Sequence, residues 1–396
     1  MPADLTIAIV GRNAATTVAH AVRCAAASPQ AAVLLVDDFS EDGMAALAQA
    51  AAPGRVRVVR PDRWRGVGHA RQTALQAIET SYGLWLDADD AFDPGYAEAM
   101  AAALQAGADM VYAASDLYDQ GSGDKTVDRP MPTFLQRPGG LWRQFERNWV
   151  SGPFCGFRTD FAVRLGMDPD QRQAEDYDFS LRALVCGARI ALMDRPRYRY
   201  VHSAQSLSRD LTQARHFTHR ALAKHEAAWL GGALQRSGLA AAEQLFTLTA
   251  FLLTMDRAAA AASVASDLAA AGDEPIAPYA RPAGWMGRFL SATAQMLLQR
   301  FDTAGDTLAM LQATAPAAEI DNNLAVCCWH RAQAAQAAQA ARAQDHLQRA
   351  LAQRPHYVDA RANLDSLQRG YAPTRITRLP LRPLPSRDVY RAAAPG

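Results

Sequence analysis

Three aspartates close together are the residues of this sequence best suited to chemistry. Asp87, Asp89 and Asp90 stand in the run Trp-Leu-Asp-Ala-Asp-Asp, directly after an apolar stretch and shortly before a proline. Carboxylates packed this closely repel one another, and the repulsion costs stability unless a cation offsets it. Carboxylate oxygens suit Mg²⁺ or Mn²⁺, which keep coordination positions open for phosphate oxygens. The motif favours a metal site over the alternative, a polar turn that only caps the next helix.

A second acidic segment also follows an apolar stretch. Residues 36–43 read Val-Asp-Asp-Phe-Ser-Glu-Asp-Gly. A carboxylate here can accept the ring N–H of a uracil or otherwise hold a nucleoside, and Ser40 or Asp42 can cap the helix that follows. Taken alone, the segment is equally well explained as a strand-to-helix turn with a good cap.

The pattern around these segments predicts how they are positioned. Short apolar runs alternate with amphipathic helical patterns, which predicts an α/β domain with a parallel sheet covered by helices on both faces. Ligands of such sheets lie at the carboxyl ends of the strands, where both acidic segments fall. The expected strands are residues 5–10, 32–36, 56–59 and 82–86, and the expected helices are residues 14–26, a helix from about 42, and 68–79.

Further along the chain the pattern becomes mixed and then helical. Shorter strands are expected at residues 110–114, 154–158 and 189–193, with a helix over 177–186. After about residue 208 alanine-rich helices take over. Pro316 and Pro355, and likewise Asn323 and Asn363, repeat with an offset of 39 to 40 residues. The offset is near the period of about 34 residues of tetratricopeptide hairpins, so an all-α, tetratricopeptide-like region is expected.

These patterns predict four parts of the chain, the last of which is rich in proline and expected to be disordered. Stacked helical hairpins form concave surfaces for peptides or proteins, so the helical part is expected to bind a protein partner. The expected parts are an α/β domain over 1–210, a helical linker over 211–283, helical hairpins over 284–369 and the tail over 370–396.

Composition excludes several classes of protein. The 396 residues carry a net charge of +1, which leaves no electrostatic footprint for nucleic acid or an anionic membrane. Five scattered cysteines lack the spacing of a zinc site. The start has an aspartate where a signal peptide is basic, and the longest uncharged apolar run, 245–255, is too short for a bilayer. We expect a bacterial cytoplasmic protein, at most peripheral at the inner membrane.

Together these motifs resemble the inverting family 2 glycosyltransferases, whose nucleotide-diphospho-sugar transferase domain has the GT-A (Rossmann-like) fold. The resemblance covers roughly residues 4–210. Its motifs are a first strand that ends near Asn13, Val-Asp-Asp-x-Ser-x-Asp-Gly at 36–43, a helix start at 66–71, Leu-Asp-Ala-Asp-Asp at 86–90, and Glu-Asp-Tyr-Asp at 175–178 with a helix end at 182–187.

The resemblance implies a role for each matched residue. Asp38 corresponds to the carboxylate that recognises the base, with Asn13 and Arg71 as further nucleotide-sugar contacts. Asp87 and Asp89 correspond to the pair that binds the ribose and the metal, with Asp89 the more direct metal ligand.

The remaining roles concern catalysis and support. Asp176 corresponds to the catalytic base, and Asp90 and Glu175 to supporting carboxylates. His202 either completes the metal site, contacts the diphosphate, or is a structural hydrogen-bonding residue.

The implied function is metal-dependent inverting transfer of a sugar from a nucleotide diphosphate donor. The acceptor is a hydroxyl of a glycan, a lipid-linked saccharide or a peptide, as in the synthesis of cell-surface polysaccharide. A UDP-sugar is favoured, but Arg12 stands where the family usually has an aromatic residue, which keeps thymidine and guanosine diphosphate donors open. Nucleotidyltransfer would need a Gly-x-Gly-x-Arg loop after the first strand, and residues 9–13 lack it. The other alternative is a non-catalytic helical-repeat scaffold with a degenerate sugar-nucleotide-binding domain.

Overall fold

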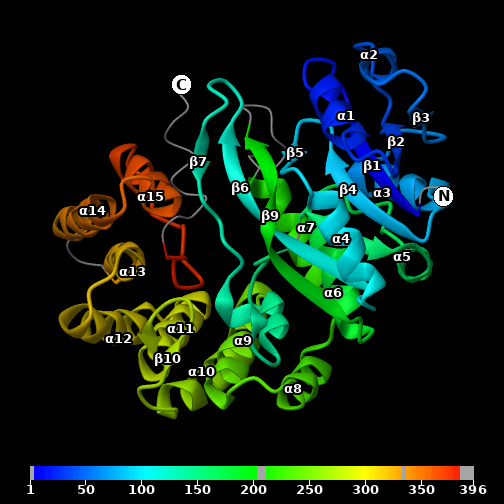
Figure 1. The fold of residues 1–396 in the computed structure, drawn as a ribbon. Coiled ribbons are helices and arrows are strands. Elements are labelled where there is room, and N and C mark those ends of the chain that lie inside the picture. The colour runs from blue at the N-terminus through cyan, green and yellow to red at the C-terminus, as the bar shows by residue number, and fades with distance from the viewer. Residues whose placement is uncertain (1–3, 151, 203–210, 332–335, 384–396) are drawn as a thin grey trace. The chain divides into compact units, whose positions relative to one another are not determined.

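The fold is divided into two compact units whose borders differ from the expected ones. A computed structural model describes all residues except 1–3, 151, 203–210, 332–335 and 384–396 (Figure 1). Unit 1 comprises residues 1–136 and 148–224, and unit 2 comprises 137–147 and 225–396. The first unit therefore extends past the expected border at 210, and a short segment from its middle belongs to the second unit.

The described residues of unit 1 form a nine-stranded mixed sheet with the order β3-β2-β1-β4-β8-β6-β9-β5, in which β7 pairs with β6. The first four strands of this order are parallel, as the alternating pattern predicted. β8 is antiparallel to both β4 and β6. The strands are β1 (Leu5–Gly11), β2 (Ala31–Asp37), β3 (Val56–Val59), β4 (Tyr82–Asp87), β5 (Ala91–Phe92), β6 (Met110–Asp119), β7 (Lys125–Val127), β8 (Cys155–Arg158) and β9 (Ile190–His202).

Helices pack against this sheet and close its core. The central strands are buried on both faces, which explains why they read as continuous apolar runs. The expected α/β class is confirmed. The helices are α1 (Val18–Ala26), α2 (Met44–Ala51), α3 (Val67–Ala77), α4 (Tyr96–Gln105), α5 (Thr159–Leu165), α6 (Glu175–Val185) and α7 (Leu211–Leu222), with a 3₁₀ helix at Thr133–Gln136.

Strand β9 is much longer than the expected 189–193. Its second half alternates charged and aromatic residues, so hydrophobicity alone does not reveal it. Arg197 is nonetheless buried, because its guanidinium pairs with Asp116 at 2.7 Å and Asp128 at 2.6 Å. Arg199 pairs with Asp93 at 2.8 Å in the same way. Ion pairs on neighbouring segments therefore allow a charged sequence to run as a strand.

Unit 2 is helical apart from the two-residue strands β10 (Pro275–Ile276) and β11 (Arg281–Pro282). Each helix from α8 to α15 packs on the next helix along the chain. The tetratricopeptide assignment stays a prediction. The helices are α8 (Ala227–Gln235), α9 (Ala241–Thr254), α10 (Ala258–Ala270), α11 (Ala283–Leu297), α12 (Phe301–Thr314), α13 (Ala318–His330), α14 (Gln336–Gln353) and α15 (Val358–Gln368).

A buried ion-pair network explains why residues 137–147 belong to unit 2. This segment contains a 3₁₀ helix, Gly140–Phe145. Arg143 lies inside the unit, where its guanidinium pairs with Glu146 at 2.5 Å and with Glu243 on α9 at 3.0 Å. The Tyr279 hydroxyl donates to the second oxygen of Glu146 at 2.6 Å. A buried charge needs such partners, so the network fixes the segment on the helices.

The expectation of a disordered tail over 370–396 is wrong for its first half. Residues 371–383 run as an extended segment along unit 2, and Thr377 is buried. Asparagine side chains of α13 supply hydrogen bonds to its main chain. Proline-rich composition cannot reveal such partners, because they come from helices far away in the sequence. Residues 384–396 lie outside the described residues.

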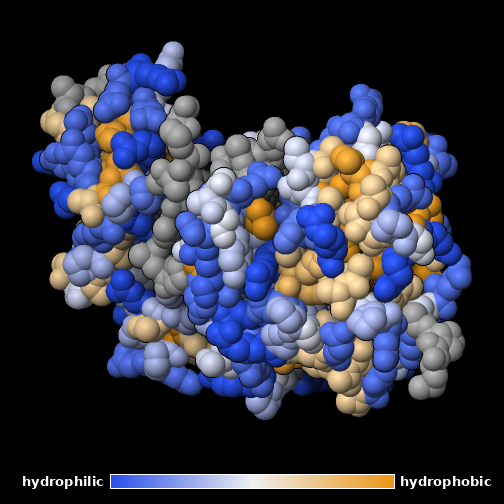
Figure 2. All heavy atoms as spheres, turned by 45° about the horizontal axis from the view of Figure 1, so that its top comes forward, coloured by the Kyte–Doolittle hydropathy of each residue, from blue (hydrophilic) through white to orange (hydrophobic). Residues whose placement is uncertain are grey.

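No helix in the described part of the chain combines the length and apolarity that a bilayer crossing requires. Figure 2 shows hydrophilic side chains mixed with scattered apolar ones on one face of the molecule.

Gly11 sets how closely the acidic loop after β4 approaches β1. A Cβ at this position would lie 2.4 Å from the Ala88 Cβ. Gly11→Ala should lower the free energy of unfolding by about 1 to 3 kcal/mol, because the added methyl overpacks this contact. Chemical denaturation of the full chain measures the change.

Ala88→Gly in the same chain is the matched control, since it removes the methyl that the new side chain meets. The double variant should regain most of the lost stability. If it is no more stable than Gly11→Ala alone, this contact is not the cause.

Candidate functional site

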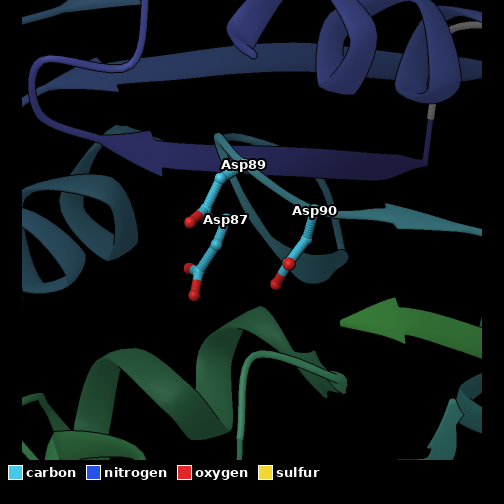
Figure 3. A group of neighbouring side chains, drawn as sticks. All are labelled: Asp87, Asp89 and Asp90. Carbon is cyan, nitrogen blue, oxygen red and sulfur yellow. The ribbon is translucent and has the colours of Figure 1, made fainter. Parts of the chain in front are cut away.

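The acidic segment at the end of β4 forms a compact cluster. Ligand oxygens of Asp87, Asp89 and Asp90 all lie within 4.8 Å of one another, and within the described residues no other such group of three is found. Figure 3 shows the three side chains pointing to the same side of the chain. The sequence prediction that these carboxylates converge is therefore met by the geometry.

Asp90 is the anchored member of the cluster. It is buried, and its oxygens accept hydrogen bonds from the Tyr198 hydroxyl at 2.8 Å and the Val201 amide at 2.7 Å, both on β9. The Tyr198 oxygen in turn accepts the amide N–H of Asp87 at 3.1 Å. Burial raises the pKa of Asp90 well above its usual range, and the other two carboxylates raise it further. Asp90 thus ties the acidic loop to the long strand.

Asp89 is the partly exposed member of the cluster whose pKa is raised. Burial raises the pKa of Asp89 to about 6, and the nearby charge of Asp87 adds to this shift. A divalent cation would remove both penalties, because it replaces lost hydration and attracts the charged form. An all-oxygen donor set fits Mg²⁺ or Mn²⁺.

Arg71 on α3 joins the cluster to a second pair of carboxylates. Its guanidinium donates to Asp87 at 2.9 Å and forms an ion pair with Glu175 at 2.9 Å, and its side chain is 2% exposed. These acidic groups raise the pKa of Arg71 despite its burial. Sequence comparison suggested Arg71 as a nucleotide contact, but its role as a buried bridge between two acidic elements could not be read from the sequence.

Helix α6 brings the remaining predicted carboxylates to the same place. Glu175 is its first residue and is buried beside Arg71. Burial raises the pKa of Glu175 to about 7, partly offset by Arg71 and increased by Asp176. Asp176 lies in the first turn, where its carboxylate accepts the Tyr177 amide at 2.7 Å. It also lies close enough to Arg71 to raise the pKa of that guanidinium.

The end of β2 contributes Asp38. Its carboxylate is buried, and the oxygen Oδ1 has no hydrogen-bond partner among the described residues. Burial raises the pKa of Asp38, while Arg12 and His69 lower it. A buried acceptor without a partner is costly, so this oxygen is suited to a donor on a ligand.

Asn13 and Asp42 connect the loops after β1 and β2. The Asn13 amide donates to Ser40 Oγ at 2.9 Å, and its side chain accepts the Glu41 amide at 3.0 Å. Asp42 accepts the Met44 amide at 3.1 Å from just before α2, but the N-cap position is Gly43 and no side chain caps the helix, so the expected cap by Ser40 or Asp42 is wrong. Asn13 thus holds the two loops together while it stays exposed. Its contact with a nucleotide stays a prediction.

Sequence reasoning missed Trp64. The loop between β3 and α3 places its ring 4.7 Å from the guanidinium carbon of Arg12, and the ring stays 48% exposed. The first strand lacks the usual aromatic residue, and Trp64 supplies an aromatic face from another loop. No signal in the sequence reveals this contact, because Arg12 and Trp64 are far apart in the chain and meet only in the folded unit.

His202 lies outside the acidic cluster. It is the last residue of β9 and lies opposite Asp119 of β6. Backbone hydrogen bonds lower the pKa of Asp119, and His202 lowers it further. Among the described residues, the cluster that could hold a metal ion consists of the three aspartates and does not include His202. Its role as a metal ligand stays a prediction without geometric support.

Comparison with known proteins finds similarity to one family in this region. Residues 6–165 match the family described as Glycosyl transferase family 2. The succinoglycan biosynthesis protein ExoU of Rhizobium meliloti is 34% identical over 52% of this chain and 64% of its own length. ExoO of the same organism is 28% identical over 52% of this chain and 63% of its own length. The chain thus spans slightly less than two thirds of the length of these relatives.

Among solved structures, TarS of S. aureus (residues 1–349), in complex with UDP-GlcNAc, is similar with a TM-score of 0.48 and 15% identity. The superposition covers 94% of this chain and 93% of that one.

Removal of the Arg71 side chain should be strongly destabilising. Arg71→Leu leaves the buried Glu175 and the partly exposed Asp87 without their shared partner, which should lower the free energy of unfolding by about 3 to 5 kcal/mol. Equilibrium denaturation at neutral pH measures the change.

Arg57→Leu is the matched control, because Arg57 pairs with Glu79 on the exposed surface of the same unit. This change should have little effect on stability. Equal losses for the two variants would contradict the assigned role of Arg71.

Proposed function

We propose that the chain, whose residues 6–165 match glycosyl transferase family 2, is a metal-dependent inverting glycosyltransferase that uses a nucleotide diphosphate sugar. The observation that carries this proposal is the meeting of the predicted residues at one edge of the sheet. In the strand register, Asp37 lies opposite Gly11 and Asp87 opposite Val10, so both acidic strand ends flank the end of β1. Arg71 then links this edge to the carboxylates of α6.

Asp89 and Asp87 are the residues that would hold the divalent ion, Mn²⁺ or Mg²⁺. Both are partly exposed, whereas Asp90 already accepts two hydrogen bonds and supports the loop. A bound divalent cation supplies positive charge for the diphosphate that leaves the sugar. The chain holds this ion through carboxylates that repel one another in its absence, which favours binding.

Asp38 is the residue that would recognise the nucleobase. Its partnerless buried oxygen can accept the ring N–H of uracil, which favours a UDP-sugar. Trp64 offers an exposed face on which a base can stack, next to Arg12. Thymine offers the same ring N–H, so the donor screen includes thymidine diphosphate sugars.

Asp176 is the residue that would act as the base. Inverting transfer is a single in-line displacement, in which one carboxylate takes the proton from the acceptor hydroxyl as its oxygen attacks the anomeric carbon. Asp176 stands in the first turn of α6, beside the Arg71 bridge. Arg71 and Glu175 would hold this helix start against the acidic loop and so fix the distance between base and donor.

The acceptor we propose is a hydroxyl of a glycan or a lipid-linked saccharide. Both curated relatives are named as succinoglycan biosynthesis proteins, which favours these acceptors over a peptide side chain.

Asp89→Ala should weaken Mn²⁺-dependent binding of UDP by about 100-fold, because a ligand worth roughly 3 kcal/mol is lost. Titration calorimetry of UDP with and without Mn²⁺ measures this.

In the unchanged chain, Mn²⁺ binding should weaken as the pH falls below about 6, the raised pKa of Asp89, because the bound form requires the ionised carboxylate.

Asp124→Ala is the control for the metal site, since Asp124 is an exposed aspartate of the same unit. It should bind Mn²⁺ and UDP as the unchanged chain does. If Asp89→Ala retains both metal-dependent binding and transfer, the metal assignment is wrong, and if no nucleotide binds with Mn²⁺, the scaffold alternative is favoured.

Asp176→Asn should bind the donor normally and lower kcat by about 100- to 10,000-fold, the usual contribution of a general base. A donor screen by mass spectrometry, followed by initial rates with the accepted sugar, measures it. A variant that keeps its rate would remove Asp176 as the base without affecting the metal site.

A further inference from the structure

The most informative feature outside the proposed active site is the extended segment 371–383 of unit 2. It follows the end of α15 and lies against α13 and α15 (Figure 1, red). Asn322, Asn323 and Asn363, whose side chains are completely buried, face this segment. A buried amide side chain costs stability unless it is hydrogen-bonded. Asparagine is therefore tolerated at these positions because the segment supplies hydrogen-bond partners.

Two of the asparagines each hold one residue of the segment by both of its main-chain groups. Asn323 accepts the Thr377 N–H at 2.8 Å and donates to the Thr377 carbonyl at 3.0 Å. Asn363 does the same with Arg375, at 2.8 Å and 2.9 Å. These bonds read the main chain and not the side chain, so they accept an extended peptide of varied sequence.

The two asparagines occupy equivalent positions of the sequence repeat. Asn323 and Asn363 are separated by the 40-residue offset that relates the two helical segments. The residues that they hold, Thr377 and Arg375, are two apart, which is the period of an extended chain. Each helical repeat therefore matches one period of the peptide, as expected of a site that is built by repetition.

A small polar pocket lies between these contacts. It receives the Thr377 hydroxyl, which accepts from the third asparagine, Asn322, at 3.0 Å and donates to Asp359 at 3.3 Å. The Tyr357 hydroxyl also contacts it. Thr377 is buried, and these polar groups suit a threonine or serine and not an apolar side chain.

The rest of the segment is held through its main chain and through the Arg378 side chain, which pairs with Asp256 at 2.6 Å. Arg147 donates to the Pro380 carbonyl at 2.9 Å, and Arg354 donates to the Arg382 carbonyl at 2.9 Å. Proline favours the extended conformation and needs no partner for an N–H. The segment thus has the properties of a bound peptide that is joined to its own site by the chain.

From these contacts we infer that the surface formed by Asn322, Asn323, Asn363 and the Thr377 pocket is a peptide-binding site. Its ligand is an extended segment of a partner protein with a threonine or serine at the central position. Residues 371–383 are the resident occupant and compete with that partner. The segment contains no helix or strand, so its local release requires less disruption than unfolding of a helix.

The first test is hydrogen exchange of the unchanged full chain. The Arg375 and Thr377 amides should be protected, yet exchange at least about 100-fold faster than the slowest amides of α13, because the segment opens locally. If these two amides exchange only as slowly as those of α13, the segment is a fixed part of the fold and the inference is overturned.

The second test measures binding of a fluorescent peptide with the sequence of residues 371–383. Thr377→Pro removes both the N–H and the hydroxyl of the resident segment, so this full-length variant should bind the peptide at least about 10-fold more tightly than the unchanged chain. Equal affinity for both chains would show that the resident segment does not compete.

The matched probes are peptides with a single N-methyl group. Methylation at the position of Thr377 should weaken binding at least about 10-fold, whereas methylation at the position of Ile376 should not, because the asparagine pair holds the former N–H. A valine in place of the central threonine should weaken binding through the pocket. If both methylated peptides bind alike, the main chain is not recognised as inferred.

Discussion

Mutual repulsion among buried carboxylates is the constraint on which the architecture of unit 1 depends. Three aspartates follow β4, and α6 contributes two more acidic side chains. One buried guanidinium, Arg71, contacts a member of each group. Burial raises the pKa values of Asp89 and Glu175, and neighbouring carboxylates raise them further although Arg71 lowers that of Glu175. The same unresolved charge makes the site suitable for a divalent ion.

The surrounding fold keeps these charges at fixed positions. Tyr198 and Val201 of β9 anchor Asp90, and Gly11 allows the acidic loop to lie directly against β1. Strand β9 can occupy its place only because Asp116, Asp128 and Asp93 pair with its arginines. The geometry of the site therefore depends on ion pairs on the far strands of the sheet as well as on the residues that would contact a donor.

Unit 2 uses neutral polar groups for a similar purpose. Its buried asparagines bond to one another and to the main chain of an extended segment, which residues 375 and 377 provide. In both units we therefore propose that polar side chains specify a ligand: a cation beside the carboxylates, and a peptide main chain beside the amides. The difference follows from charge, because carboxylates repel one another and amides pair equally well with donors and acceptors.

The sequence by itself determined the α/β class, the parallel strands, the two acidic strand ends and the helical second half. Each depends on local periodicity or on residues close in the chain. Tertiary structure decided the bridge from Arg71 to Glu175, the approach of Trp64 to Arg12, the length of β9 and the binding of residues 371–383. These features join segments that are distant in sequence, and the burial that makes their interactions strong exists only after the chain has folded.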